Sequence, residues 1–145
     1  MIRLSHRVSP VQLSNLGCEN LAIQTKDSTP GKLTAFFDFE EILILDSHTC
    51  DTVWGDFSAG NFQSKLSFAG WVGFFGYEFL AHHFGVQLHA KNDLSVPSAW
   101  FGRPQSLVTL EADQTIIESS DDTREQEIAK LLQKPISGEI SISAS

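Results

Sequence analysis

The sequence has little cysteine and few cationic side chains, and each shortage excludes a class of protein. Two cysteines, Cys18 and Cys50, are too few for a disulfide-stabilised scaffold. They predict reduced thiols in a cytoplasmic protein, with a single bridge as the alternative. Ten lysines and arginines stand against 18 aspartates and glutamates, a formal net charge of −8. This charge disfavours nucleic acids and anionic membranes as partners, because both are polyanions.

Long apolar runs are also absent. The most apolar window, residues 68–81, spans 14 residues and includes Glu78, whereas a membrane-spanning helix needs about 20. Residues 1–17 lack the apolar stretch of roughly 7–15 residues that marks a signal peptide. The length of 145 residues suits one domain, since domains cluster at about 100–150 residues. We therefore predict a cytoplasmic protein with one domain at residues 1–136 and a polar tail or linker at 137–145.

The sequence does contain short periodic segments separated by turn residues. Ser9 and Gly17 suit the two ends of a short helix. A second helix is predicted from Asp122, with a capping box completed by Glu125, to Pro135. Strands are predicted at 20–25, 32–39, 42–45, 52–54, 107–110 and 115–117, the last two joined by a turn at 111–114. Several strands with two or three helices indicate an α+β fold.

Side chains that could perform chemistry do not cluster in the sequence. His82 and His83 are neighbours, so on a helix or a strand they point apart and do not form a zinc site. Neither cysteine has a recognisable activating neighbour. We predict no catalytic and no metal-binding residues in this chain.

Glycine recurs at every third position at Gly70, Gly73 and Gly76. A phosphate-binding loop needs small residues between its glycines and usually a lysine or a helix N-terminus behind them. Here bulky apolar residues, three of them aromatic, separate the glycines. The pattern instead predicts a tightly packed strand or bend that another backbone approaches closely.

The same segment, AGWVGFFGYE at residues 69–78, resembles the N-terminal domain of a family of chorismate-using synthases. The family contains anthranilate synthase component I and aminodeoxychorismate (para-aminobenzoate) synthase component I. Its N-terminal domain carries Gly-Gly-x-x-Gly-x-x-x-Tyr-Asp/Glu, then Pro-Asp, then a strand hairpin, within antiparallel sheets in a sandwich-like arrangement with a few flanking helices. The residues taken as this structural motif are Gly70, Gly73, Gly76, Tyr77, Glu78 and Pro97.

The resemblance implies a non-catalytic domain of a chorismate-aminating synthase of the tryptophan or folate pathway. In this family chorismate, Mg²⁺ and all catalytic residues belong to a C-terminal catalytic domain, and a glutamine amidotransferase subunit supplies ammonia. The catalytic domain and the amidotransferase are thus the expected partners, and this chain alone is expected to hold no cofactor and to be inactive. The alternative is a free-standing small-ligand-binding or regulatory module of the same fold, without enzyme activity.

The resemblance also implies part of a tryptophan-type effector pocket. Thr25, Lys32 and Thr34 occupy the positions of a strand-end serine and an Arg-Tyr-Ser segment that help form it. A threonine hydroxyl can hydrogen-bond an amino acid. Loss of the arginine fork and the tyrosine ring removes planar and stacking contacts, however, so we expect weak tryptophan binding.

Overall fold

The computed structural model describes residues 1–26, 28–45, 65–75 and 99–135. The described elements are, in chain order, β1 (Ile2–Leu4), the 3₁₀ helix η1 (Pro10–Leu16), β2 (Ala22–Thr25), β3 (Leu33–Leu45), β4 (Val72–Phe75), β5 (Ala99–Leu110), β6 (Thr115–Ser119) and the helix α3 (Asp122–Leu132).

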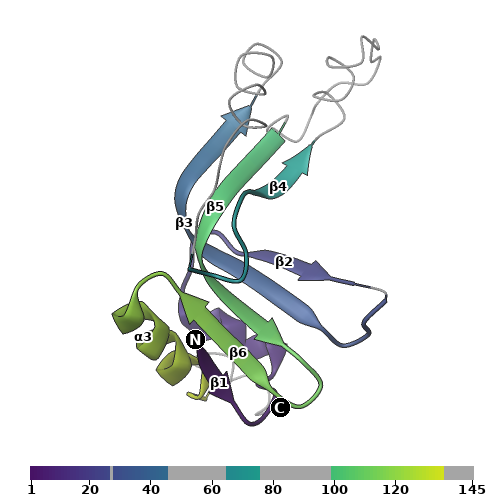
Figure 1. Ribbon diagram of the computed structural model, residues 1–145, viewed down its shortest axis with the longest axis vertical. Helices are drawn as coiled ribbons and strands as arrows, with labels where there is room; N and C mark the ends of the chain where they lie inside the picture. The colour runs from purple at the N-terminus through teal and green to yellow at the C-terminus, as the bar shows by residue number, and fades with distance from the viewer. Residues whose placement is uncertain (27, 46–64, 76–98, 136–145) are drawn as a thin grey trace, which may run out of the picture. The chain divides into compact units, whose positions relative to one another are not determined.

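These strands form one sheet in the order β1-β6-β5-β3-β2, and β4 pairs with β5 beside that path (Figure 1). The β1–β6, β2–β3, β4–β5 and β5–β6 pairs are antiparallel, and Figure 1 shows β3 and β5 running in opposite directions. With η1 and α3 beside the sheet, the α+β class with antiparallel strands and flanking helices is confirmed.

The described residues divide into two compact units. The first comprises 1–26, 28–39, 65–68 and 104–135, and the second comprises 40–45, 69–75 and 99–103. The division falls between Phe39 and Glu40 in β3 and between Arg103 and Pro104 in β5. Both long strands therefore contribute to both units.

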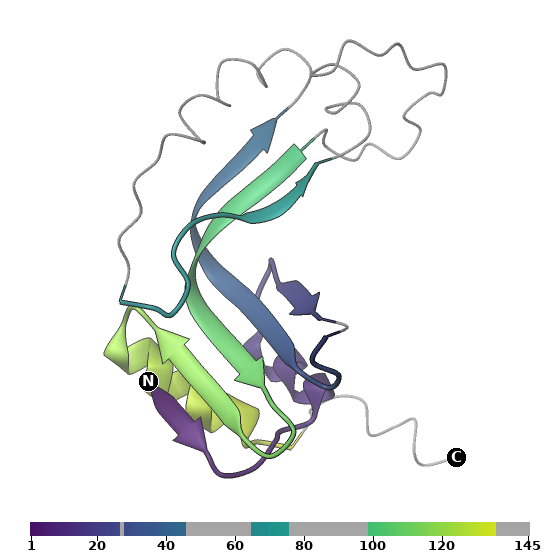
Figure 2. The same ribbon diagram turned by 45° about the vertical axis from the view of Figure 1, so that its right-hand side comes forward.

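In the first unit, η1 and α3 pack on one face of the sheet. Helix α3 contacts η1, β6 and β1, and Figure 2 shows it beside β6. The sheet and the two helices enclose an apolar core, because each contributes one buried face. Its central members are Leu13, Leu16, Ala35, Phe37, Val108, Leu110, Ile117, Ile128 and Leu132.

The other face of this unit's sheet is covered by residues 65–68. Leu66 is buried there, and the ring of Phe68 meets Phe36 edge to face with centroids 5.1 Å apart. The carboxylate of the buried Glu118 accepts hydrogen bonds from the Ser67 backbone N–H at 2.9 Å and from the Ser67 hydroxyl at 2.7 Å. One carboxylate thus fixes this segment against β6.

Most of the predicted elements recur, with shifted boundaries. The first helix is a 3₁₀ helix ended by Gly17 at φ +65°, and the hairpin turns at 111–114 as expected. The strands predicted at 32–39 and 42–45 are one strand, β3. The capping box at Asp122 was wrong by one residue: the N-cap is Asp121, whose carboxylate accepts from the backbone of Thr123 and Arg124.

Several other predictions fall outside the described residues. These are the strand at 52–54, the motif residues Gly76, Tyr77, Glu78 and Pro97, and the tail at 137–145. Strand β1 and the first half of β5 were not predicted. None of the described helices is long and apolar enough to cross a membrane.

Candidate functional site

The glycine segment contains a position where two strand backbones come very close. Gly73 is in β4, directly opposite Phe101 of β5. A Cβ atom at Gly73 would overlap the carbonyl oxygen of Trp100 and lie 2.8 Å from the Cα of Phe101. Gly70 has a φ of +130°, a conformation that side chains strongly disfavour. The close approach of another backbone, predicted from the glycine spacing, is confirmed at Gly73.

The sheet of the second unit has one buried and one exposed face. Its buried cluster contains Leu45, Ala99 and Phe101, with Leu43 and Trp71 packed against them. Because successive side chains of a strand alternate between faces, Ile42 and Ile44 of β3 lie on the opposite face. So does Phe74, which pairs with Trp100.

We call Ile42, Ile44 and Phe74 the apolar face of the second unit. Their exposed fractions are 41%, 64% and 42%. On the buried side, the Arg103 guanidinium lies 2.6 Å from the Glu41 carboxylate and 5.9 Å from the Trp71 ring centroid. One face is therefore closed by an ion pair, whereas the other presents large apolar side chains.

The odd-numbered side chains of β3 pack with different positions of β5 in the two buried clusters. Ala35 and Phe37 pack with Val108 and Leu110, the even-numbered positions of β5. Leu43 and Leu45 pack with Ala99 and Phe101, the odd-numbered positions. Regular alternation in both strands does not allow this exchange, so one extra residue must interrupt the pairing between the two clusters, as in a β-bulge.

Asp38 has the backbone of such a bulge. Its φ is +54°, the one positive value among the described non-glycine residues. The left-handed conformation costs an L-residue about 1 kcal/mol, although aspartate adopts it more readily than most. The strain therefore needs compensation from the surroundings.

The compensation comes from a cluster of polar side chains around Asp38. Arg124 of α3 binds both carboxylate oxygens, with Nε 2.8 Å from Oδ2 and Nη2 3.1 Å from Oδ1. The hydroxyl of Ser106 donates to Oδ2 at 2.6 Å and lies 3.0 Å from the hydroxyl of Ser119. We call Cys18, Asp38, Ser106, Ser119 and Arg124 the Asp38 cluster.

Two further contacts hold Arg124. It donates to Glu127 at 2.7 Å along α3, and its guanidinium carbon lies 5.8 Å from the ring centroid of Phe37. The hydrogen bond with Asp38 raises the pKa of Arg124, outweighing the opposite effect of burial. The guanidinium is thus a fixed charge, and its two-point bond orients Asp38.

The Cys18 thiol completes this cluster but is not activated. It is a free thiol, and burial raises its pKa; the Asp38 charge raises it further, while Arg124 lowers it in part. A nucleophilic cysteine needs the opposite shift, because the thiolate is the reactive form. The Asp38 cluster therefore has the properties of a structural network.

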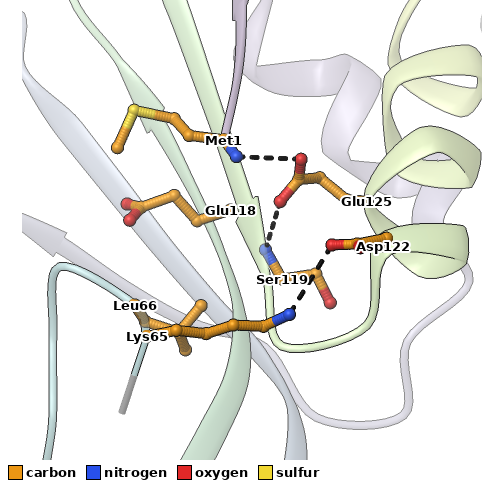
Figure 3. Close-up of a pocket in the computed structure, with 7 residues that line it drawn as sticks. All are labelled: Met1, Lys65, Leu66, Glu118, Ser119, Asp122 and Glu125. Carbon is orange, nitrogen blue, oxygen red and sulfur yellow. Dashed lines mark hydrogen bonds and ion pairs between the residues drawn. The ribbon is translucent and has the colours of Figure 1, made fainter.

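A small pocket lies between the start of α3 and residues 65–66 (Figure 3). Its volume is about 90 Å³, whereas small-molecule sites measure roughly 300–1,000 Å³. Lys65 pairs with Asp122 at 3.5 Å, and the Met1 amine pairs with Glu125 at 3.0 Å.

In the described ranges, no group of three or more His, Cys, Asp or Glu side chains is arranged to hold a metal ion.

The proposed tryptophan-pocket residues all lie in or beside the β2–β3 hairpin. Thr25 pairs with Leu33, and Thr34 pairs with Gln24. Directly paired residues share a face, so Thr25 and Thr34 point to opposite faces of the hairpin. Thr34 is half-buried, while Thr25 and Lys32 are exposed. The structure brings the three residues close in the fold but does not direct both threonines to one side.

Sequence reasoning missed Asp38 and Arg124. One signal could have indicated Asp38, because it is a charged residue within a strongly apolar strand. Its partner is 86 residues away, and nothing in the sequence pairs the two.

The comparisons with known proteins add no relative: the chain matches no protein-family model, no curated protein and no solved structure.

Proposed function

We propose that the chain is the non-catalytic N-terminal-type domain of a chorismate-aminating synthase and packs against a chorismate-binding catalytic domain. The observation that carries this proposal is the apolar face of the second unit. Three large apolar side chains on one sheet face are between 41% and 64% exposed. Large exposed apolar side chains that share one sheet face are typical of interaction surfaces in monomeric proteins.

Burial of this face by a partner is energetically favourable. Fully burying one such side chain contributes about 1.5–3 kcal/mol relative to leaving it in water. Ile42 and Ile44 come from β3, whose opposite face is already packed through Leu43 and Leu45. A rigid, pre-formed sheet face loses little conformational entropy on binding, so most of this gain is retained.

Two features of the glycine segment support the same proposal. Gly70 and Gly73 both meet backbone requirements that other residues do not satisfy. The segment is followed by the β5–β6 hairpin, the order that the resemblance implies. The alternative, a self-contained ligand-binding module, needs a complete pocket; among the residues that the structure describes, the pocket in Figure 3 has a volume of only about 90 Å³.

A binding experiment with a separately purified catalytic domain tests the proposal. The full chain is mixed with the C-terminal catalytic domain of an aminodeoxychorismate synthase or an anthranilate synthase, and association is measured by analytical ultracentrifugation. We expect a complex with one of the two catalytic domains at a Kd of about 1–10 μM, roughly −7 to −8 kcal/mol.

Matched variants locate the interface. Ile44→Asp places a charge in the apolar face and is expected to abolish the complex. Val11→Asp is the control, because Val11 lies on η1 and is 57% exposed, close to the 64% of Ile44. Failure of the unmodified chain to bind either catalytic domain, or equal binding by both variants, contradicts the proposal.

A further inference from the structure

The second half of β3 carries equivalent side chains on both faces. Residues 40–45 read Glu-Glu-Ile-Leu-Ile-Leu. Each face therefore receives one glutamate and two aliphatic side chains. Register is strongly specified only where the two faces of a strand differ in polarity. The local sequence does not decide whether Leu43 and Leu45 or Ile42 and Ile44 are buried.

The side chains of the alternative register can form the same kinds of contact as those of the observed one. In the observed register, Glu41 pairs with Arg103, and Leu43 and Leu45 join Ala99 and Phe101. A shift by one residue turns Glu40 toward the position of Glu41, and Ile42 and Ile44 toward the positions of the leucines. The ion pair and the aliphatic contacts are then replaced by equivalents.

The bulge at Asp38 distinguishes the two registers. With the extra residue at Asp38, the odd-numbered side chains beyond it face Phe101. Without the extra residue, regular alternation from Ala35 and Phe37 places the even-numbered side chains of β3, Ile42 and Ile44, against Phe101. Asp38 has the left-handed backbone of such a bulge, and its carboxylate accepts hydrogen bonds from Arg124 and Ser106.

We propose that the Arg124–Asp38–Ser106 contacts are a register lock, which selects the pair of aliphatic side chains that β3 buries beyond residue 39. When the lock is broken, β3 moves by one residue against β5. Leu43 and Leu45 then become exposed, and Ile42 and Ile44 become buried. The composition of the apolar face is thereby controlled from α3, and this inference does not depend on the proposed function.

Thiol labelling at two neighbouring positions tests the lock. Reporter chains carry Ile44→Cys or Leu45→Cys, and labelling by iodoacetamide is read at each position by peptide mass spectrometry. Ile44 is 64% exposed and Leu45 is 2% exposed. Because buried groups react only through local opening, the Ile44→Cys thiol is expected to react at least about tenfold faster.

Two lock variants and one control are then added to each reporter. Arg124→Gln removes the two-point bond, and Asp38→Val removes the carboxylate and disfavours the positive φ that the bulge requires. Lys130→Gln, an exposed change on the same helix, is the control. We expect both lock variants, but not the control, to reverse the ratio of the two labelling rates.

The other outcomes overturn the inference. An unchanged ratio in both lock variants shows that the register is set elsewhere. Equal acceleration at both positions shows general loosening or unfolding in place of a shift, and circular dichroism of the same samples records which of the two occurs.

Discussion

At the scale of single residues, Gly73 has the least room for a side chain among the four glycines whose surroundings the structure describes. A Cβ there overlaps the Trp100 carbonyl oxygen and crowds the Phe101 Cα, and both obstacles are backbone. We expect Gly73→Ala to lower the free energy of unfolding by about 3 kcal/mol, the upper range for overpacking. Urea denaturation followed by circular dichroism measures the loss.

The control for this substitution is Gly31→Ala. Gly31 has a φ of +85° but no atom within 4 Å of a built Cβ. Its substitution costs only the backbone strain, about 1 kcal/mol. Equal losses for the two variants would mean that β4 does not approach β5 as closely as described.

The Cys18 thiol gives a second prediction at the residue scale. Burial, and then the charge of Asp38, raise its pKa above the ordinary value of 9.0, and Arg124 opposes them. Arg124→Gln removes the opposing influence, so the pKa should rise further. Titration of the labelling rate in a Cys50→Ser background measures both values, and a lower pKa in the variant contradicts the arrangement.

The same shift has a consequence for stability. The thiol ionises more easily in the unfolded chain than in the folded one, because its pKa is higher in the folded state. Its contribution to the free energy of unfolding is therefore fully present below pH 9.0, the ordinary pKa. That contribution is lost as the pH rises through the higher folded-state pKa. Cys18→Ser, which removes the titrating group, should flatten this alkaline decrease in the free energy of unfolding.

At the scale of elements, the sequence predicts well where local rules decide. The 3₁₀ helix, the 111–114 turn and the apolar side of α3 follow from Pro10, Gly17 and the spacing of Ile128 and Leu132. The fusion of two predicted strands into β3 does not follow. The two predicted strands are separated by the adjacent charges Glu40 and Glu41, and the partner of Glu41 within the sheet is Arg103, 62 residues away in the chain.

Helix α3 offers a test of the corrected cap. Asp121 accepts from the Thr123 and Arg124 backbone at 2.8 Å and 3.3 Å, so Asp121→Ala should cost about 1 kcal/mol. Asp122→Ala is the matched control: this side chain is 89% exposed, and we expect a loss of about 0.3 kcal/mol from the helix dipole. The reverse order, measured by urea denaturation, would restore the cap predicted from sequence.

At the scale of the whole molecule, the sequence predicts a fold class but not a site. The α+β class follows from the segment periods, and the close packing at Gly73 follows from glycines set among bulky residues. The division into two units and the Asp38 cluster depend on contacts between distant segments. Ser106 lies 68 residues from Asp38 in the chain, so residue spacing in the sequence does not predict that they are in contact.

The hairpin geometry leads to the last prediction, on tryptophan binding by the full chain. Thr25 and Thr34 point to opposite faces of the β2–β3 hairpin, so one ligand cannot engage both hydroxyls from one side. Lys32 supplies a point charge where the family resemblance implies an arginine fork. Isothermal titration should therefore show no binding tighter than about 1 mM, roughly −4 kcal/mol. Micromolar affinity, lost in Thr34→Val but retained in the exposed control Thr123→Val, would instead establish a self-sufficient pocket and favour the free-standing module over a domain that needs a catalytic partner.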